Sequence, residues 1–260
     1  MPIHDINGEP FNIELGGTEG KPALMFSNSL SSNLSMWDPQ AEALGKRFRI
    51  VRYDSRGHGK SVVSEGPYSI AQLGRDALAI MDALGLKKVH WCGLSKGGMV
   101  GMWLLANAPE RLNKVILANT AAAMPPPDLW NGRIHNVRKN GMQAIAPITL
   151  DRWFTKRFQE ADPATVDRVR EMILSTPPEG NIACAAAIRD MDQRDSLRKA
   201  KNPVLVIAGK HDPSTTTARA KEIKKAIKGA KLVVLDAAHI SNLEQPKAFT
   251  KAVSEFLKGK

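Results

Sequence analysis

The chain has 260 residues, of which 43% are hydrophobic and 24% charged, which is enough for one domain with a sizeable core and an inserted subdomain. Its 37 Lys and Arg residues exceed its 26 Asp and Glu residues, giving a formal net charge of +11, yet the basic residues are scattered and only 5% of residues are aromatic. We therefore expect no nucleic-acid partner, because nucleic-acid-binding surfaces gather basic and aromatic side chains together.

Short apolar runs alternate with longer helical patterns along the chain. Runs rich in Val, Ile and Leu predict strands buried on both faces at residues 23–27, 48–53, 89–93, 115–119, 204–208 and 232–235. An alternating segment at 11–15 predicts an antiparallel hairpin strand at the sheet edge. Helical patterns cover 70–84, 97–107, 216–227 and 246–257. This order predicts an α/β fold with a mostly parallel, doubly wound sheet.

Residues 124–201 interrupt this alternation, because they contain no clear strand. The segment opens with three prolines at 125–127, and helical composition covers 130–142, 151–159, 163–175 and 181–191. We expect a helical cap here, inserted between two parts of one core domain, residues 1–123 and 202–260. An insertion at the carboxyl edge of a parallel sheet would cover the place where such sheets bind ligands.

A serine stands between glycines directly after the strand predicted at 89–93. The run Gly93-Leu94-Ser95-Lys96-Gly97 has the pattern G-x-S-x-G in a strand–turn–helix context, which is typical of a nucleophile held on a strained turn. The amino end of the following helix would favour developing negative charge beside Ser95. A glycine-rich turn with an incidental serine is the alternative interpretation.

A serine nucleophile needs a base and an acid that orients the base. Of six histidines, His239 follows the last predicted strand, at the sheet edge where the turn of Ser95 opens. Asp212 follows the preceding strand and supplies the acid, while the neighbouring His211 is expected to be a turn residue. The chain order Ser95, Asp212, His239 predicts a catalytic triad.

A tetrahedral intermediate also needs backbone donors for its oxyanion. The amide of Lys96, directly after the nucleophile, is expected to supply one. The amide of Leu30, in the loop after the strand at 23–27, is expected to supply the other. The Lys96 side chain either raises the local positive potential or extends out along the helix.

The chain resembles the α/β-hydrolase superfamily over nearly its whole length and, within it, the 3-oxoadipate enol-lactonases. The superfamily pattern is carried by segments around the predicted triad and the turn at residues 54–61. More specific are three cap segments, Trp130-Asn-Gly-Arg-Ile134, Arg152-Trp-Phe154 and Cys184-Ala-Ala-Ala-Ile-Arg-Asp-Met191. The resemblance implies an α/β-hydrolase fold with a helical cap. It also implies hydrolysis of a small lactone that bears a carboxylate, in bacterial breakdown of aromatic compounds.

One face of the first cap helix combines apolar and cationic residues. The residues that share this face, at i, i+3, i+4 and i+7 spacing, are Trp130, Arg133, Ile134 and Val137. An arginine on such a face either meets an anion or extends past its apolar neighbours to solvent. The resemblance favours Trp130 and Arg133 as binders of the substrate carboxylate, with Trp153 and Arg189 as weaker candidates.

These observations together predict a serine hydrolase that opens 3-oxoadipate enol-lactone, without a metal or cofactor. A general carboxylesterase or perhydrolase on the same scaffold is the alternative, because fold does not determine substrate. A ligand receptor that retains the triad is a further alternative. The expected partner is a small anionic lactone, and the chain is expected to be a monomer or a homo-oligomer.

The turn at 54–61 is expected to hold the sheet edge together and not to take part in chemistry. Cys92 and Cys184 lie in apolar contexts, so buried free thiols are expected. The first twenty residues predict no signal peptide, and no apolar run approaches the length of a membrane span. We expect a cytoplasmic protein with no membrane partner.

Overall fold

One eight-stranded sheet organises the computed structural model, which describes residues 3–258. Its strands are β1 (Ile3–Ile6), β2 (Glu9–Gly17), β3 (Ala23–Ser27), β4 (Arg49–Tyr53), β5 (Val89–Leu94), β6 (Leu112–Ala118), β7 (Val204–Gly209) and β8 (Lys231–Leu235). Their order is β1-β2-β4-β3-β5-β6-β7-β8, in which β2 pairs antiparallel with β1 and β4. All pairs from β4 to β8 are parallel, so the predicted mostly parallel sheet is confirmed.

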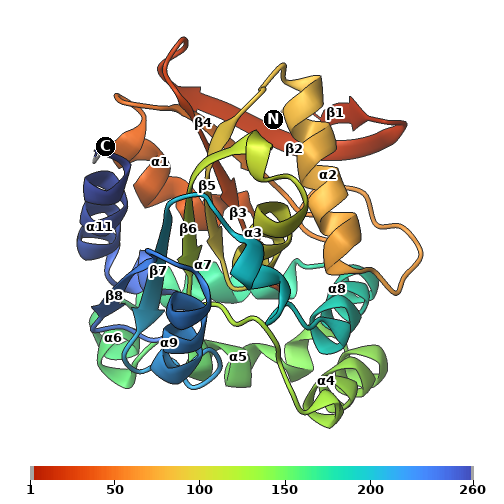
Figure 1. The fold of residues 1–260 in the computed structure, drawn as a ribbon. Helices are drawn as coiled ribbons and strands as arrows, with labels where there is room; N and C mark the ends of the chain where they lie inside the picture. Colours follow the sequence, from red (N-terminus) through yellow and green to blue (C-terminus); the bar gives the residue numbers. More distant parts are fainter. Residues whose placement is uncertain (1–2, 259–260) are drawn as a thin grey trace.

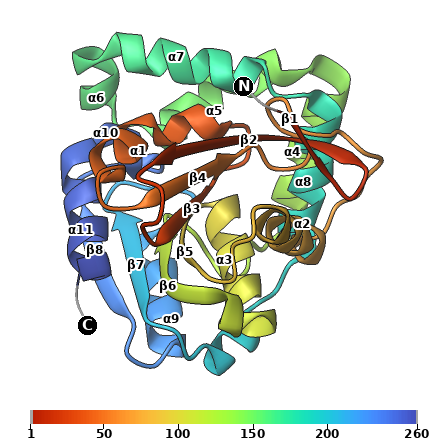
Figure 2. The same cartoon turned by 90° about the horizontal axis from the view of Figure 1, so that it is seen from above.

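Helices cover both faces of this sheet (Figures 1 and 2). One face carries α2 (Ile70–Ala83), α3 (Lys96–Asn107) and α9 (Thr217–Ala226), and the other carries α1 (Asp38–Leu44) and α11 (Pro246–Lys258). Successive strand residues point to opposite faces, so that in β3 Met25 belongs to one apolar core and Leu24 and Phe26 to the other. Burial on both faces explains why β3 and β7 are continuous apolar runs. The expectation of two-sided burial is wrong for β8, which is the other edge strand and leaves Val234 46% exposed.

The segment between β6 and β7 is helical. It contains α4 (Pro127–Asn140), α5 (Ala146–Trp153), α6 (Lys156–Ala161), α7 (Pro163–Leu174) and α8 (Pro178–Asp190). Figure 1 shows α4, α5, α6 and α8 gathered at one end of the sheet. The short α10 (Ser241–Glu244) follows β8, and 3₁₀ turns lie at Leu34–Trp37, Pro109–Arg111, Met142–Ala144 and Ser196–Lys199. Within residues 3–258, no helix has the length and apolar character needed to cross a bilayer.

Two local predictions are corrected by the structure. The alternating segment at 11–15 belongs to β2, but β1 lies outside it and forms the edge of the sheet. The prediction of one helix over 151–159 is wrong, because α5 ends at Trp153 and α6 begins only at Lys156. At this break the Thr155 hydroxyl accepts a hydrogen bond from the Phe158 amide at 3.3 Å and so begins a new helix.

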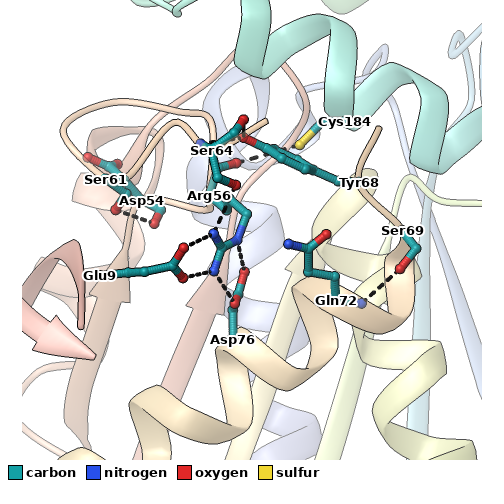
Figure 3. A network of polar contacts seen from close by, with 10 residues as sticks. All are labelled: Glu9, Asp54, Arg56, Ser61, Ser64, Tyr68, Ser69, Gln72, Asp76 and Cys184. Carbon is teal, nitrogen blue, oxygen red and sulfur yellow. Dashed lines mark hydrogen bonds and ion pairs between the residues drawn. The ribbon is translucent and has the colours of Figure 1, made fainter. Parts of the chain in front are cut away.

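Arg56, in the turn after β4, ties two edge elements together (Figure 3). Its guanidinium donates two hydrogen bonds of 2.8 Å to the Asp76 carboxylate on α2, and it also pairs with Glu9 on β2. The Arg56 side chain is only 5% exposed, so its charge depends on these partners. The contacts agree with the prediction that this turn holds the sheet edge together.

Asp76→Ala is expected to lower the free energy of unfolding by about 3 kcal/mol, because it leaves Arg56 buried with Glu9 alone. Urea unfolding followed by circular dichroism measures the change. Asp82→Ala is the matched control on the same helix: Asp82 is 66% exposed and pairs with Arg111, so a loss below about 1 kcal/mol is expected. Equal losses in the two variants would show that the Arg56 pair is no stronger than a surface pair.

Candidate active site

Ser95 occupies a strained turn between β5 and α3. Its φ is 56° and its ψ is −114°, values that a residue other than glycine rarely adopts. A Cβ built on Gly93 would lie 2.1 Å from the Gly97 carbonyl oxygen, and one built on Gly97 would lie 2.1 Å from the Ser27 carbonyl oxygen. Both glycines of the sequence pattern are therefore required by close backbone contacts, and the predicted strand–turn–helix context is confirmed.

Asp212 and His239 are brought together from the ends of β7 and β8. His239 Nδ1 lies 2.8 Å from Asp212 Oδ2, and both side chains are buried. Burial alone would raise the pKa of Asp212, but the charge of His239 and the hydrogen bonds to the carboxylate outweigh it and lower this pKa. An ionised carboxylate at this distance fixes the imidazole with its proton on Nδ1, which leaves Nε2 free to act as a base.

Thr215 and Asn119, which the sequence analysis missed, also hold the Asp212 carboxylate. The Thr215 hydroxyl donates to Oδ2 at 2.6 Å, and Asn119 Nδ2 donates to the same oxygen at 3.1 Å. The amides of Ser214 and Thr215 donate to Oδ1 at 2.8 and 2.9 Å. Thr215 could have been found from its position three residues after an aspartate in a loop. Asn119, 93 residues away from Asp212, has no such local signal.

Ser95 and His239 both line one cavity of about 480 Å³ beneath the helical insertion. Leu30 lines the same cavity. Its loop is attached to the turn of Ser95, because the Gly97 amide donates to the Asn28 carbonyl oxygen at 3.0 Å. Lys96 is the first residue of α3, directly after Ser95. The loop that contains Leu30 and the turn that contains Ser95 and Lys96 are therefore held together at this cavity.

The Lys96 side chain does not extend out along the helix into solvent. It is fully buried, and within residues 3–258 its ammonium group has no hydrogen-bond acceptor. Burial is the largest influence on its pKa and lowers it, while nearby Cys184 and Asp54 act in the opposite direction. Of the two alternatives left open by the sequence, extension out along the helix is therefore contradicted.

Three of the four cap candidates reach the cavity. Trp130, Arg133 and Trp153 line it, and the Trp153 ring lies 6.2 Å from the His239 ring, centroid to centroid, at a tilt of 31°. Arg189 does not: it pairs with Asp190 and donates to Asn131 at the surface. His211 is also at the surface, where it pairs with Asp236 at 2.8 Å.

Arg133 is partly buried, and its guanidinium is incompletely satisfied. Its Nη2 donates to Ser31 Oγ at 2.9 Å, but in the part of the chain that the structure describes its Nε has no acceptor. Burial, assisted by the charge of Arg152, lowers the pKa of Arg133 to about 10, so it remains a cation at neutral pH. Arg152 and Arg219 also line the cavity, and among the described lining residues there is no Asp or Glu. An anionic ligand would be favoured in this cavity.

The chain is similar over nearly its whole length to known hydrolases. The alpha/beta hydrolase fold family matches residues 22–246. The chain is 43% identical to 3-oxoadipate enol-lactonase 2 of Acinetobacter baylyi, covering 95% of this chain and 92% of that protein. It is 36% identical to 3-oxoadipate enol-lactonase 1 of the same organism, covering 98% of each. A crystal structure of the enol-lactonase from Burkholderia xenovorans LB400 superimposes with a TM-score of 0.97 at 42% identity, covering 99% of this chain and all of that one.

Proposed function

This chain belongs to the alpha/beta hydrolase fold family, and on that premise we propose that it is a serine hydrolase that opens 3-oxoadipate enol-lactone to give 3-oxoadipate. The observation that carries the proposal is the cavity itself, which Ser95, His239 and the guanidinium-bearing Arg133 line together. A guanidinium in a cavity with no acidic side chain among its described lining residues is suited to the carboxylate of this lactone. The named relatives support the same substrate.

The chemistry begins with Ser95 Oγ attacking the lactone carbonyl while His239 Nε2 takes its proton. Asp212 orients the imidazole and offsets the charge that develops on it. The amides of Leu30 and Lys96 stabilise the oxyanion. Collapse of the intermediate breaks the C–O bond of the ring, and the released enolate oxygen takes the proton from the His239 imidazolium, which returns the imidazole to its neutral form. The enol formed on the acyl-enzyme tautomerises to the ketone. Water activated by His239 then hydrolyses the acyl-enzyme and frees Ser95.

The helical segment 124–201 serves in this proposal as the cap that binds the remote part of the substrate. Arg133 holds the carboxylate, while Trp130 and Trp153 exclude water from the pocket. We place the reaction in the breakdown of aromatic compounds in the cytoplasm, with no cofactor. The direct test is the spectrophotometric loss of the enol-lactone with purified enzyme. No turnover of the lactone, together with rapid hydrolysis of simple esters, would favour the general carboxylesterase.

Arg133→Ala is expected to lower kcat/KM for the anionic lactone by about 10- to 150-fold, because hydrogen bonds to charged groups contribute about 1.5–3 kcal/mol. p-Nitrophenyl acetate has no carboxylate, so its loss should stay below about 5-fold. Arg133→Lys should recover only part of the loss, since an ammonium group is a point charge and not a planar fork.

Arg138→Ala is the matched control for this prediction. Arg138 is an exposed cation on the same helix and lies outside the cavity. It should leave kcat/KM for both substrates within about 2-fold of the wild type, as surface substitutions usually do. Equal losses on the lactone and the neutral ester in Arg133→Ala would show that Arg133 supports the cap and does not read the substrate charge.

A further inference from the structure

Ser31 joins the loop after β3 to three other segments of the chain. Its backbone amide donates to His58 Nε2, in the turn after β4, at 3.0 Å. Its hydroxyl oxygen accepts from Arg133 Nη2 on α4 at 2.9 Å and from Asn181 Nδ2 on α8 at 2.7 Å. Ser31 is fully buried and has a φ of 63°. A serine in this left-handed conformation needs support from its surroundings, and these contacts supply it.

The loop that Ser31 belongs to is held at both of its ends. At the first end, Asn28 Nδ2 donates to the Tyr53 carbonyl oxygen at 2.8 Å, and the Asn28 carbonyl oxygen accepts from the Gly97 amide at 3.0 Å. At the second end, Ser31 is held by His58 and by two helices of the insertion, α4 and α8. Leu30 lies between these ends, directly before Ser31. Contacts of Ser31 therefore restrain the backbone directly after Leu30.

His58 gives this second end a rigid support. Its Nε2 accepts the Ser31 amide, so its proton lies on Nδ1, which is 3.3 Å from the Arg56 carbonyl oxygen. Burial, together with the charges of Lys96 and Arg133, lowers the pKa of His58 well below its usual value, so the ring remains a neutral acceptor. His58 does not line the cavity, so its contact with Ser31 lies away from the substrate. The contact that can respond to substrate is the one between Ser31 and Arg133.

Arg133 faces Ser31 and the cavity at the same time. Its Nη2 is on Ser31 Oγ, its Nε has no acceptor among the described residues, and it lines the cavity of Ser95. A carboxylate that binds the guanidinium from the cavity would fix the plane of this group, and with it the Nη2 donor that Ser31 accepts. Binding energy from a remote part of the substrate would then be expressed at the reacting carbonyl, which raises kcat as well as lowering KM.

We propose that Ser31 is a positioning residue that couples binding of the substrate carboxylate at Arg133 to placement of the Leu30 amide at the oxyanion. The proposal rests on the proposed function. It adds that Arg133 does more than bind: through Ser31 it completes the oxyanion site when an anionic substrate is present. A neutral ester uses the same oxyanion site, but it has no carboxylate to bind Arg133 and so does not complete the site through Ser31.

The test is a double-mutant cycle between Arg133→Ala and Ser31→Gly, with kcat and KM measured separately on the enol-lactone. Glycine accepts a positive φ and keeps the backbone bond to His58, so the substitution removes the CH₂OH side chain and its contacts with Arg133 and Asn181. With Ser31 present, Arg133→Ala should lower kcat about 10-fold and raise KM. In the Ser31→Gly background, Arg133→Ala should raise KM and leave kcat unchanged. The effects of the two substitutions on kcat would then be non-additive by about 10-fold. Ser31→Ala is the second variant should Ser31→Gly not fold.

Ser32→Gly is the matched control, because its hydroxyl bonds the Ser29 carbonyl oxygen within the same loop at 2.9 Å and not Arg133. Its effect on kcat should be additive with that of Arg133→Ala. A merely structural role for Ser31 would also give additive kcat effects, and that result overturns the coupling. On p-nitrophenyl acetate the non-additivity should fall to about 2-fold or less.

The failure of the proposed function is distinguishable from the failure of the coupling. A wild-type enzyme that does not open the enol-lactone contradicts the function. The same cycle is then run with mono-p-nitrophenyl adipate, an ester that carries a remote carboxylate, against p-nitrophenyl acetate. Non-additivity in kcat confined to the anionic ester supports the coupling, and additivity on both esters overturns it.

Discussion

Ser95→Ala is expected to lower kcat for the enol-lactone by at least about 10³-fold while the protein stays folded. No other hydroxyl lies on this turn to replace the nucleophile. The backbone contacts of residue 95 remain: its amide donates to the Ala118 carbonyl oxygen at 2.9 Å, and its carbonyl oxygen accepts from Thr120 Oγ1 at 2.8 Å. Thermal unfolding should therefore show little change, and retention of more than about a tenth of the activity would exclude Ser95 as the nucleophile.

Covalent labelling gives an independent measurement of the same role. A fluorophosphonate should modify the wild-type enzyme on the tryptic peptide of residues 89–96, in which Ser95 is the only serine. The Ser95→Ala enzyme should show no adduct on this peptide. Equal labelling of the two proteins would place the reactive group elsewhere, whatever the kinetics of the variant.

The buried strands could be predicted because each is a short apolar run that is covered on both faces. β1 could not, because only Ile6 of its four residues is buried and the strand has no apolar run to show. α1 was missed as well, since it has seven residues and only Gln40 and Leu44 are buried. The break after Trp153 depends on Glu244, whose carboxylate contacts the Thr155 hydroxyl from 89 residues away. A contact of that separation leaves no local signal.

The candidate site divides in the same way between local and distant determinants. The glycines around Ser95 mark its turn: Gly93 relieves crowding within the turn itself, and Gly97 relieves crowding against Ser27 at the end of β3. Asp212 and His239 follow strands, so their placement at one sheet edge follows from the topology. Ser31 and Arg133 are 102 residues apart, and their contact exists only once the insertion has packed against the loop after β3. The contacts proposed to recognise the remote part of the substrate are therefore the hardest to predict from the sequence pattern.

Asp212→Asn should reduce kcat by about 10³- to 10⁴-fold, because the carboxylate is surrounded by donors on both oxygens. Oδ1 accepts two backbone amides, and Oδ2 accepts from Thr215, Asn119 and His239. An asparagine must turn its own NH₂ group toward one of these sets. If NH₂ faces His239, the imidazole has to accept at Nδ1 and carries its proton on Nε2, where it cannot take the proton of Ser95.

The opposite orientation of the substituted side chain does not avoid the problem, because its NH₂ group would then face the Ser214 and Thr215 amides at the Oδ1 position. Either orientation also removes the negative charge that stabilises the imidazolium during attack. His211→Ala is the matched control one residue away: His211 is half-exposed and pairs only with Asp236 among the described residues, so a loss below about 3-fold is expected, as for surface substitutions. Steady-state kinetics on the enol-lactone compares the two variants, and a mild Asp212→Asn beside a severe His211→Ala would show that the acid has been assigned to the wrong residue.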